Sequence, residues 1–214
     1  PLNAADYKAL CQNLGLDVSK LGNADTDWQD QIFCTSVSTN HSVSVQGGLK
    51  NMPYRVSVGY NTSNGIVKTS WMNRFNTSFN ISPSFLDNHL NLNITGKYMH
   101  EKNRYADASG AIGSALSIDP TRPVYVDSSD PTYDTFGGYY QPYQNAPSTF
   151  NSAWKYTNNP NAPQNPLALL EMKRTMAYAN DLSGNIEVDY KLHGFEDLHI
   201  PGSLEAQYTT PREE

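Results

Sequence analysis

Two carboxylates near the end of the chain are the residues with the best spacing for catalysis. Glu187 and Asp189 stand two positions apart, which places both side chains on one face of a strand, as a pair of acid and base carboxylates requires. The five histidines are scattered, and most of them fall at strand ends or turns. We therefore expect no catalysis and interpret Glu187 and Asp189 as structural charges, so the chain is not expected to be an enzyme.

Neither the aspartates nor the cysteines have the spacing of a metal site. Asp25, Asp27 and Asp30 cluster in sequence, but no twelve-residue calcium loop surrounds them, and helix capping accounts for them better. Cys11 and Cys34 lack zinc-site spacing. Either a disulfide or two buried free thiols fits the sequence. We expect no cofactor and no metal.

A segment from residue 125 to 156 is rich in Tyr, Pro, Gly and Asn and provides the best candidates for ligand binding. Tyr and Trp rings offer a large contact area with a polar tip, suited to sugar rings or to a partner protein. The alternative is that these rings order the interior of the long segment itself. The candidates are Tyr139, Tyr140, Tyr143, Trp154 and Tyr156.

The composition narrows the class of protein. The chain has 214 residues, of which 38% are apolar and only 17% charged, with a net charge of −6. The negative charge argues against a nucleic-acid partner. No run of eighteen apolar residues exists, so we expect no transmembrane helix. The first residues lack the basic start and apolar stretch of a signal peptide.

Strands are predicted where apolar and polar residues alternate, and one of them carries Glu187 and Asp189. The alternation continues across short turns, which predicts an antiparallel meander. Pro201-Gly202 breaks the last stretch. The predicted strands are 41–46, 54–61, 75–82, 90–98, 185–192 and, weakly, one from Leu198 onwards.

Short helices are expected between and before the strands. Asn3 can cap a helix over residues 4–14, and Thr26 can cap one in TDWQDQIF. In the long segment after His100, a helix is expected over residues 110–118. Another begins after Asn165, with Pro166 in its first turn.

Alternation alone does not reveal whether the apolar face meets a protein core or lipid. The polar faces of the first four strands carry Ser and Asn with few charges, at Arg55 and Lys97. Connections alternate between short and long, which is typical of an outer-membrane barrel. Both observations favour lipid. The alternative is a soluble, secreted all-β carbohydrate-binding module.

Several motifs follow one another along the chain from about Asn23 to Leu198. They are TDWQDQIFCTSVSTNHSVSVQGGLKNMPYRVSVGYNTSNGIVKTS, ISPSFLDNHLNLN, KNRYAD, GAIGSALSIDPTRPVY and NPLALLE. In this order they resemble SusC-like (SusC/RagA-type) TonB-dependent transporters of the outer membrane. Two departures are Cys34, where Arg is expected, and Pro201 within a strand.

The resemblance implies an all-β fold: part of an antiparallel up-and-down transmembrane barrel of roughly 22 strands, early in the barrel and just after the plug domain. Residues 1–39 then form an extracellular loop with short helices, 40–100 four barrel strands, and 101–182 a long extracellular loop. Residues 183–208 form two further strands and 209–214 a tail. No plug sequence is recognised, so we expect a fragment of a larger protein that cannot transport by itself.

The resemblance also implies a function and partners. Such transporters import a nutrient, a glycan or a peptide, across the outer membrane of a Gram-negative bacterium, with energy from TonB acting through the plug. A SusD-like lipoprotein covers the mouth, and lipid surrounds the barrel. The side chains expected to face the lumen are Arg55, Ser57, Asn76, Asn80, Asn93, Lys97, Glu187 and Asp189.

Overall fold

The structure, a computed structural model, describes residues 2–147 and 155–213. These residues form two compact units, and each is described on its own. The helix–loop unit comprises Pro1–Thr35, Gly65–Thr69 and Ala106–Arg174, and the sheet unit comprises Ser36–Asn64, Ser70–Tyr105 and Thr175–Glu214.

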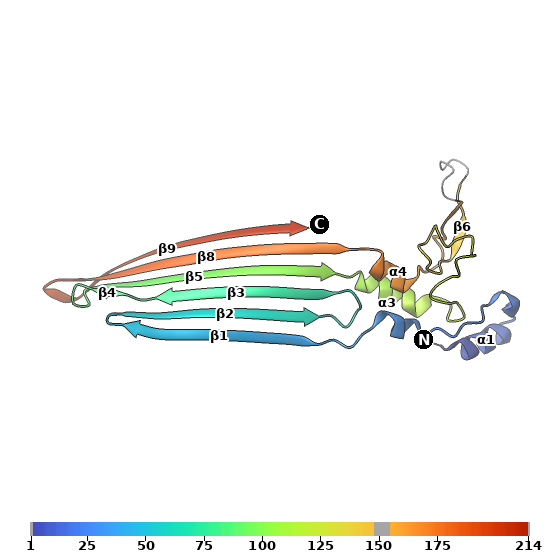
Figure 1. The fold of residues 1–214 in the computed structure, drawn as a ribbon, viewed down its shortest axis with the longest axis horizontal. Helices are drawn as coiled ribbons and strands as arrows, with labels where there is room; N and C mark the ends of the chain where they lie inside the picture. The colour runs from blue at the N-terminus through green and yellow to red at the C-terminus, as the bar shows by residue number, and fades with distance from the viewer. Residues whose placement is uncertain (1, 148–154, 214) are drawn as a thin grey trace. The chain divides into compact units, whose positions relative to one another are not determined.

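The sheet unit is an antiparallel meander, as the sequence predicts. Six long strands pair in the order β1-β2-β3-β5-β8-β9, and the short β4 pairs with β5. Figure 1 shows these strands side by side in a single layer. The bounds are β1 (Ser38–Leu49), β2 (Met52–Asn64), β3 (Trp71–Ile81), β4 (Ser84–Phe85), β5 (Leu90–Tyr105), β8 (Thr175–Leu192) and β9 (Phe195–Glu213).

The strands are longer than expected. β5 continues to Tyr105 and β8 begins at Thr175, so the connection between them is shorter than the expected loop over 101–182. The alternation ends early because Lys102 and Arg104 occupy positions of apolar parity, and because Ala177 and Ala179 occupy polar ones.

The last strand also runs through residues expected to interrupt or follow it. β9 includes Pro201-Gly202 and extends to Glu213, where a tail had been expected from 209. Pro201 lies opposite Asp189 of β8. Among the described residues β9 has a neighbour on one side only, and an edge strand tolerates a residue without an N–H donor.

The sheet has no interior of its own. Among its described apolar side chains only Met176, 4% exposed, and Pro83 are buried. Both faces of the single layer are therefore open within the sheet unit, and β1 and β9 are open edges within the described part of the chain.

The helix–loop unit packs around a small core. Helices α2, α3 and α4 bring together Trp28, Ile32, Ala111, Ala115 and Leu170. The bounds are α1 (Ala4–Asn13), the 3-10 helix η1 (Val18–Lys20), α2 (Trp28–Ile32), α3 (Ala108–Ser117), β6 (Tyr143–Asn145), β7 (Tyr156–Asn158) and α4 (Pro166–Glu171). None of the helices in residues 2–147 and 155–213 is long and apolar enough to span a membrane.

The helix caps confirm two predictions and correct a third. Asn3 caps α1 and Asn165 caps α4, as expected. The cap of α2 is Asp27, whose carboxylate accepts from two backbone N–H groups, and not Thr26. The Thr26 hydroxyl instead donates to the carbonyl of Arg122 at 2.6 Å.

The two cysteines are free thiols. Cys11 is buried, whereas Cys34 is exposed. The disulfide left open by the sequence is therefore not formed, and the expectation that both thiols are buried is wrong for Cys34.

Candidate functional site

The strand register sorts the sheet side chains into two chemically different faces. We call the side that carries Val58 the apolar face. One row across it, from β1 to β9, reads Val43, Val58, Thr77, Tyr98, Leu182 and Tyr208. The adjacent row in the polar parity reads Ser44, Ser57, Ser78, Lys97, Ser183 and Gln207. We call the side that carries Ser57 the polar face.

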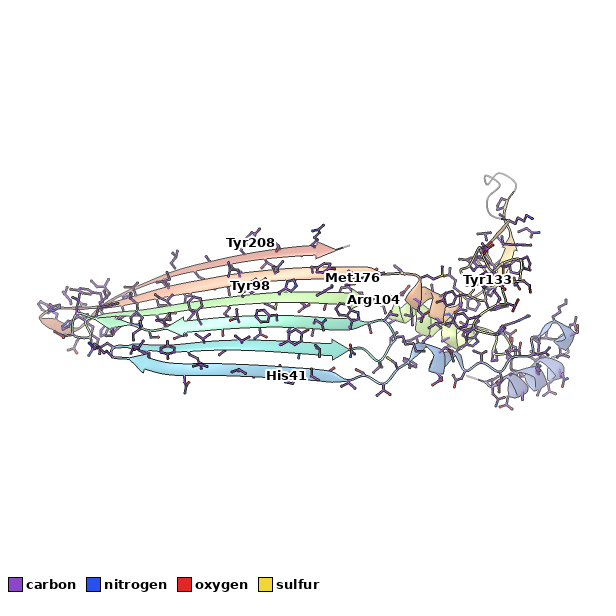
Figure 2. All side chains as sticks on the ribbon, in the orientation of Figure 1. His41, Tyr98, Arg104, Tyr133, Met176 and Tyr208 are labelled. Atoms are coloured by element: carbon purple, nitrogen blue, oxygen red, sulfur yellow. The ribbon has the colours of Figure 1, made fainter. Side chains whose placement is uncertain are left out.

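Large apolar side chains stand uncovered on the apolar face. Val43 and Leu204 are each 68% exposed, and Phe79 in the middle of the sheet is 44% exposed. Figure 2 shows side chains along the whole length of the strands, with Tyr98 and Tyr208 labelled. The alternating apolar stretches run over residues 52–60 of β2, 90–98 of β5 and 182–192 of β8, and they are shorter in β1 and β3. A tilted strand needs about nine to eleven residues to cross a membrane.

All eight residues predicted to face a lumen share the polar face. Across the strands Arg55 lies opposite Asn80, and Asn93 opposite Glu187. Ser57 and Lys97 belong to one row, Asn76 lies opposite Gly59, and Asp189 lies opposite Asn91.

A continuous chain of hydrogen bonds links part of this face. The Asn80 amide donates to Asn93 at 2.9 Å, and the Asn93 amide donates to Glu187 at 3.0 Å. The Asn185 amide donates to the other oxygen of Glu187 at 3.0 Å. Glu187 is thus an acceptor that orients amides on β5 and β8, which suits a structural charge better than an acid or base.

Further charged residues on the polar face escaped the sequence analysis. Arg74 pairs with Glu101 on the neighbouring strand at 2.6 Å, and Asp181 and Glu205 have the same parity. Parity counted from Arg55 and Lys97 through the full strand lengths would have found Arg74, Glu101 and Asp181, but the predicted strands were too short to include them.

The described aromatic candidates of the long segment contact different partners. The Tyr139 hydroxyl donates to Glu171, and its ring lies 5.2 Å from that of Tyr125. Burial, then the hydrogen bond and charge of Glu171, raise the pKa of Tyr139. Tyr140 contacts the guanidinium of Arg122, 5.7 Å from its ring centroid, and burial raises its pKa.

The other two described candidates pair with each other. Tyr143 on β6 and Tyr156 on β7 meet edge to face with centroids 4.9 Å apart. Tyr156 also lines a hollow of about 340 Å³ with Phe136 and Pro147. Tyr139 lines a second hollow, of about 290 Å³, which shares Phe136. The remaining candidate, Trp154, lies outside the described residues.

Within the described ranges no group of three or more His, Cys, Asp or Glu side chains is arranged to hold a metal ion. His199 lies 2.9 Å from Asp189, and His89 stacks on His193 with centroids 3.8 Å apart. Both contacts are pairwise and involve the hairpin ends of the sheet.

Comparison with known proteins gives the family. No protein-family model matches the chain. The TonB-dependent receptor SusC of Bacteroides thetaiotaomicron is 53% identical over 209 residues, which is 97% of this chain and 21% of SusC. The chain belongs to the SusC-like family of TonB-dependent receptors. A second such receptor, P26 of Formosa agariphila, is 23% identical over 78% of the chain and 14% of its own length.

A solved structure shares the fold of this SusC-like chain. The RagAB peptide importer in its closed-closed state matches with a TM-score of 0.57 at 18% identity, over 90% of this chain and 20% of that one. The open sheet is consistent with part of a transporter barrel. The SusC-like chain spans about a fifth of the length of SusC.

Proposed function

We propose that this chain forms part of the barrel wall of a TonB-dependent transporter that imports a nutrient across the outer membrane of a Gram-negative bacterium. The observation that carries the proposal is the separation of faces: six strands in register present one apolar and one polar side. A single-layer sheet with such faces needs a cover over its apolar side, and in the wall of an outer-membrane barrel lipid provides that cover while the other side meets polar protein or water.

The apolar face then meets lipid, and the polar face lines the lumen. Short hydrogen-bonding side chains suit a wall that packs against a plug, because Ser and Asn can satisfy polar groups without large charges. The soluble carbohydrate-binding module, the alternative drawn from the sequence, requires a second layer over Val43, Phe79 and Leu204. No such layer lies in the described part of the sheet unit.

The polarity of the barrel follows from its connections. Residues 50–51 and 193–194 are tight turns at one end of the strands, whereas 65–70 and 106–174 connect the other ends. Short turns face the periplasm and long loops the exterior in outer-membrane barrels. The long segments would therefore meet a SusD-like lipoprotein and the arriving nutrient, while TonB acts through a plug outside this chain.

The nutrient is a glycan or a peptide. The family resemblance implies these two classes, and the solved structure that shares the fold is that of a peptide importer. Tyr143 is 47% exposed, so its pair with Tyr156 offers a ring for stacking on a sugar or contacting the lid. None of these residues is proposed to catalyse a reaction.

A pair of adjacent cysteine substitutions tests the wall assignment in the intact transporter. Every native cysteine of the intact transporter, Cys11 and Cys34 among them, is first replaced by Ser, and Val56→Cys and Ser57→Cys are then made separately. Each single cysteine carries an environment-sensitive fluorophore in a bilayer. Lipids with quenchers on their acyl chains should quench the label at 56 and leave that at 57 largely unaffected.

The reverse pattern, or equal accessibility of both labels to a water-soluble quencher, would contradict the wall assignment. The substrate class needs a separate test. A strain that lacks the gene is grown on defined glycans and on defined peptides as sole nutrient sources, and failure on one class with rescue by the intact gene identifies the import.

A further inference from the structure

Cationic and aromatic side chains occupy one end of the apolar face. The register extends that face by two rows beyond the row that contains Tyr60 and Phe75. We call them the basic–aromatic rows. Their members on β3, β5, β8 and β9 are Asn73, Lys102, Tyr178 and Arg212 in one row and Trp71, Arg104 and Met176 in the next.

Side-chain contacts confirm that Lys102 stands on this face. Its Nζ lies 5.8 Å from the ring centroid of Trp71 and 5.4 Å from that of Tyr178. Arg104 and Met176 lie opposite each other in the outer row, and Figure 2 labels both at this end of the sheet. A lysine between two rings is held by cation–π attraction with its ammonium still able to contact a ligand.

On the apolar face, the described Lys and Arg side chains lie at one end of the sheet only. Among the described strands, every Lys or Arg with apolar-face parity lies in these two rows. The others, Arg55, Arg74, Lys97 and Lys191, have polar-face parity. No Asp or Glu stands in either basic–aromatic row.

The spacing suits a single anion. Lys102 and Arg104 are two residues apart on β5, about 7 Å along the strand, and Arg212 is two strands from Lys102, about 10 Å away. Long side chains from these backbone positions can converge on one tetrahedral group. Arginine binds phosphate through two parallel hydrogen bonds, and lysine adds a compact charge.

The depth of the rows identifies the source of that anion. On the proposed wall, a cation at the middle of the lipid band costs about 2–4 kcal/mol, whereas one at its end reaches the headgroups. Aromatic rings favour the same level. The rows lie at the strand ends joined by the long connections, which is the exterior end on the proposed orientation.

We propose that Lys102, Arg104 and Arg212 bind a phosphate group of a glycolipid headgroup in the outer leaflet, with Trp71 and Tyr178 packed against the same headgroup. This inference rests on the proposed wall function, because only a lipid-facing apolar side places the rows at headgroup level.

Titration of the intact purified transporter with three probes tests the site. Bisphosphorylated lipid A, its dephosphorylated form and inorganic phosphate are added in turn, and bound molecules are counted by native mass spectrometry. The variant Lys102→Gln/Arg104→Gln/Arg212→Gln should bind the bisphosphorylated lipid more weakly, by roughly fivefold for each charge removed. The dephosphorylated lipid should bind weakly to both proteins.

A matched control removes the same charge from the other face. Arg55→Gln/Lys97→Gln/Lys191→Gln should bind the phosphorylated lipid like the wild type. If the first triple variant does not fold, Lys102→Gln alone keeps both rings and should still show its single-charge loss.

Equal binding of the phosphorylated lipid by wild type and by the apolar-face variant would overturn the inference. So would inorganic phosphate that binds as tightly as the lipid, because the site would then be an ordinary anion site. The cysteine labels separate the two proposals. If lipid quenches the label at 56 but the triple variant at 102, 104 and 212 binds the phosphorylated lipid like the wild type, only the phosphate site is refuted. Quenching at 57 in place of 56 refutes the wall as well.

Discussion

Gly22 lies where a distant segment passes too close for any side chain. Its N–H donates to the Thr121 hydroxyl at 2.8 Å, and Ala24 donates to the carbonyl of the same residue. A Cβ on Gly22 would stand 2.1 Å from that carbonyl oxygen. Thr121 is fully buried, so the backbone has little room to retreat.

Gly22→Ala should therefore destabilise the helix–loop unit by about 1–3 kcal/mol, the range for forced overpacking. Gly113→Ala is the matched control, because nothing lies within 4 Å of its added methyl in α3 and Ala favours a helix by about 0.5–1 kcal/mol. Amide hydrogen exchange of α3 in the intact protein measures both. Similar protection in the two variants would contradict the close approach.

Tyr139 gives the helix–loop unit a stability that depends on pH. Burial first, and then the hydrogen bond and charge of Glu171, raise its pKa above the ordinary tyrosine value. A raised pKa means that the folded state holds the proton more tightly, so the contribution is complete below about pH 10 and is lost as the pH rises through the folded pKa.

Ultraviolet absorbance of tyrosinate, measured against pH in the wild type and in Tyr139→Phe, checks this expectation. The difference between the two curves is the ionisation step of Tyr139. The step assigned by Tyr139→Phe should occur above the ordinary tyrosine range in the wild type, and Glu171→Gln should move it down while leaving the ring half-buried. A step that stays in place in Glu171→Gln would show that the carboxylate does not act on this hydroxyl.

At the scale of elements, the existence of the strands could be predicted and their ends could not. Alternation identified the centre of each long strand, because apolar residues there keep to one face. A shift of the register by one residue would exchange the two faces. The alternation failed toward the ends of β5 and β8, where Lys102 and Arg104 take apolar-parity positions. On the proposed wall these strand ends lie at the level of the lipid headgroups and not of the acyl chains. Polar side chains are tolerated on the lipid-facing side at that level, so the polarity of a residue no longer indicates its face.

The helix–loop elements were predictable only where the signal is local. Asn165 before Pro166 marks a helix start in three residues of sequence. By contrast, residues 22–26 bond to residues 120–122 across almost a hundred positions, and no local pattern predicts such a contact. The contacts of the aromatic candidates could not be predicted for the same reason, because the Tyr139 hydroxyl donates to Glu171 and the Tyr143 ring packs on Tyr156.

Asn165 joins α4 to two other segments. Substitutions can separate the two roles of its side chain, as acceptor and as donor. Its Oδ1 caps α4, while its Nδ2 donates to the carbonyls of Val124 at 2.9 Å and Tyr140 at 3.0 Å. Asn165→Ala should cost about 2–4 kcal/mol, because the cap is lost and buried carbonyls lose their donor.

Asn165→Asp keeps the capping oxygen but replaces the donor with an acceptor near two carbonyls. Limited proteolysis of the intact protein should cut near α4 in both variants, while hydrogen exchange at the amides of Leu167 and Ala168 should rise mainly in Asn165→Ala. Equal exposure of these two amides in both variants would show that the cap contributes nothing to α4.

For the whole molecule, the sheet unit gains stability from what surrounds it. A layer without a core needs a cover over its apolar face, and its open edges β1 and β9 expose backbone groups that lipid cannot satisfy. Both requirements are met when further strands close a barrel around a plug. The two faces should therefore respond in opposite ways to the same charge.

Ile186→Arg and Asn185→Arg place one cation on opposite faces at adjacent positions of β8. Ile186 lies in the apolar row with Ile81 and Ile94, so Arg there should destabilise the intact transporter in a bilayer by about 2–4 kcal/mol. Arg at 185 faces polar neighbours and can pair with Glu187, which the Asn185 amide already contacts at 3.0 Å, so its effect should be close to zero. Denaturant unfolding from lipid vesicles compares the two, and a larger loss in Asn185→Arg would mean that the polar face, not the apolar one, meets the acyl chains.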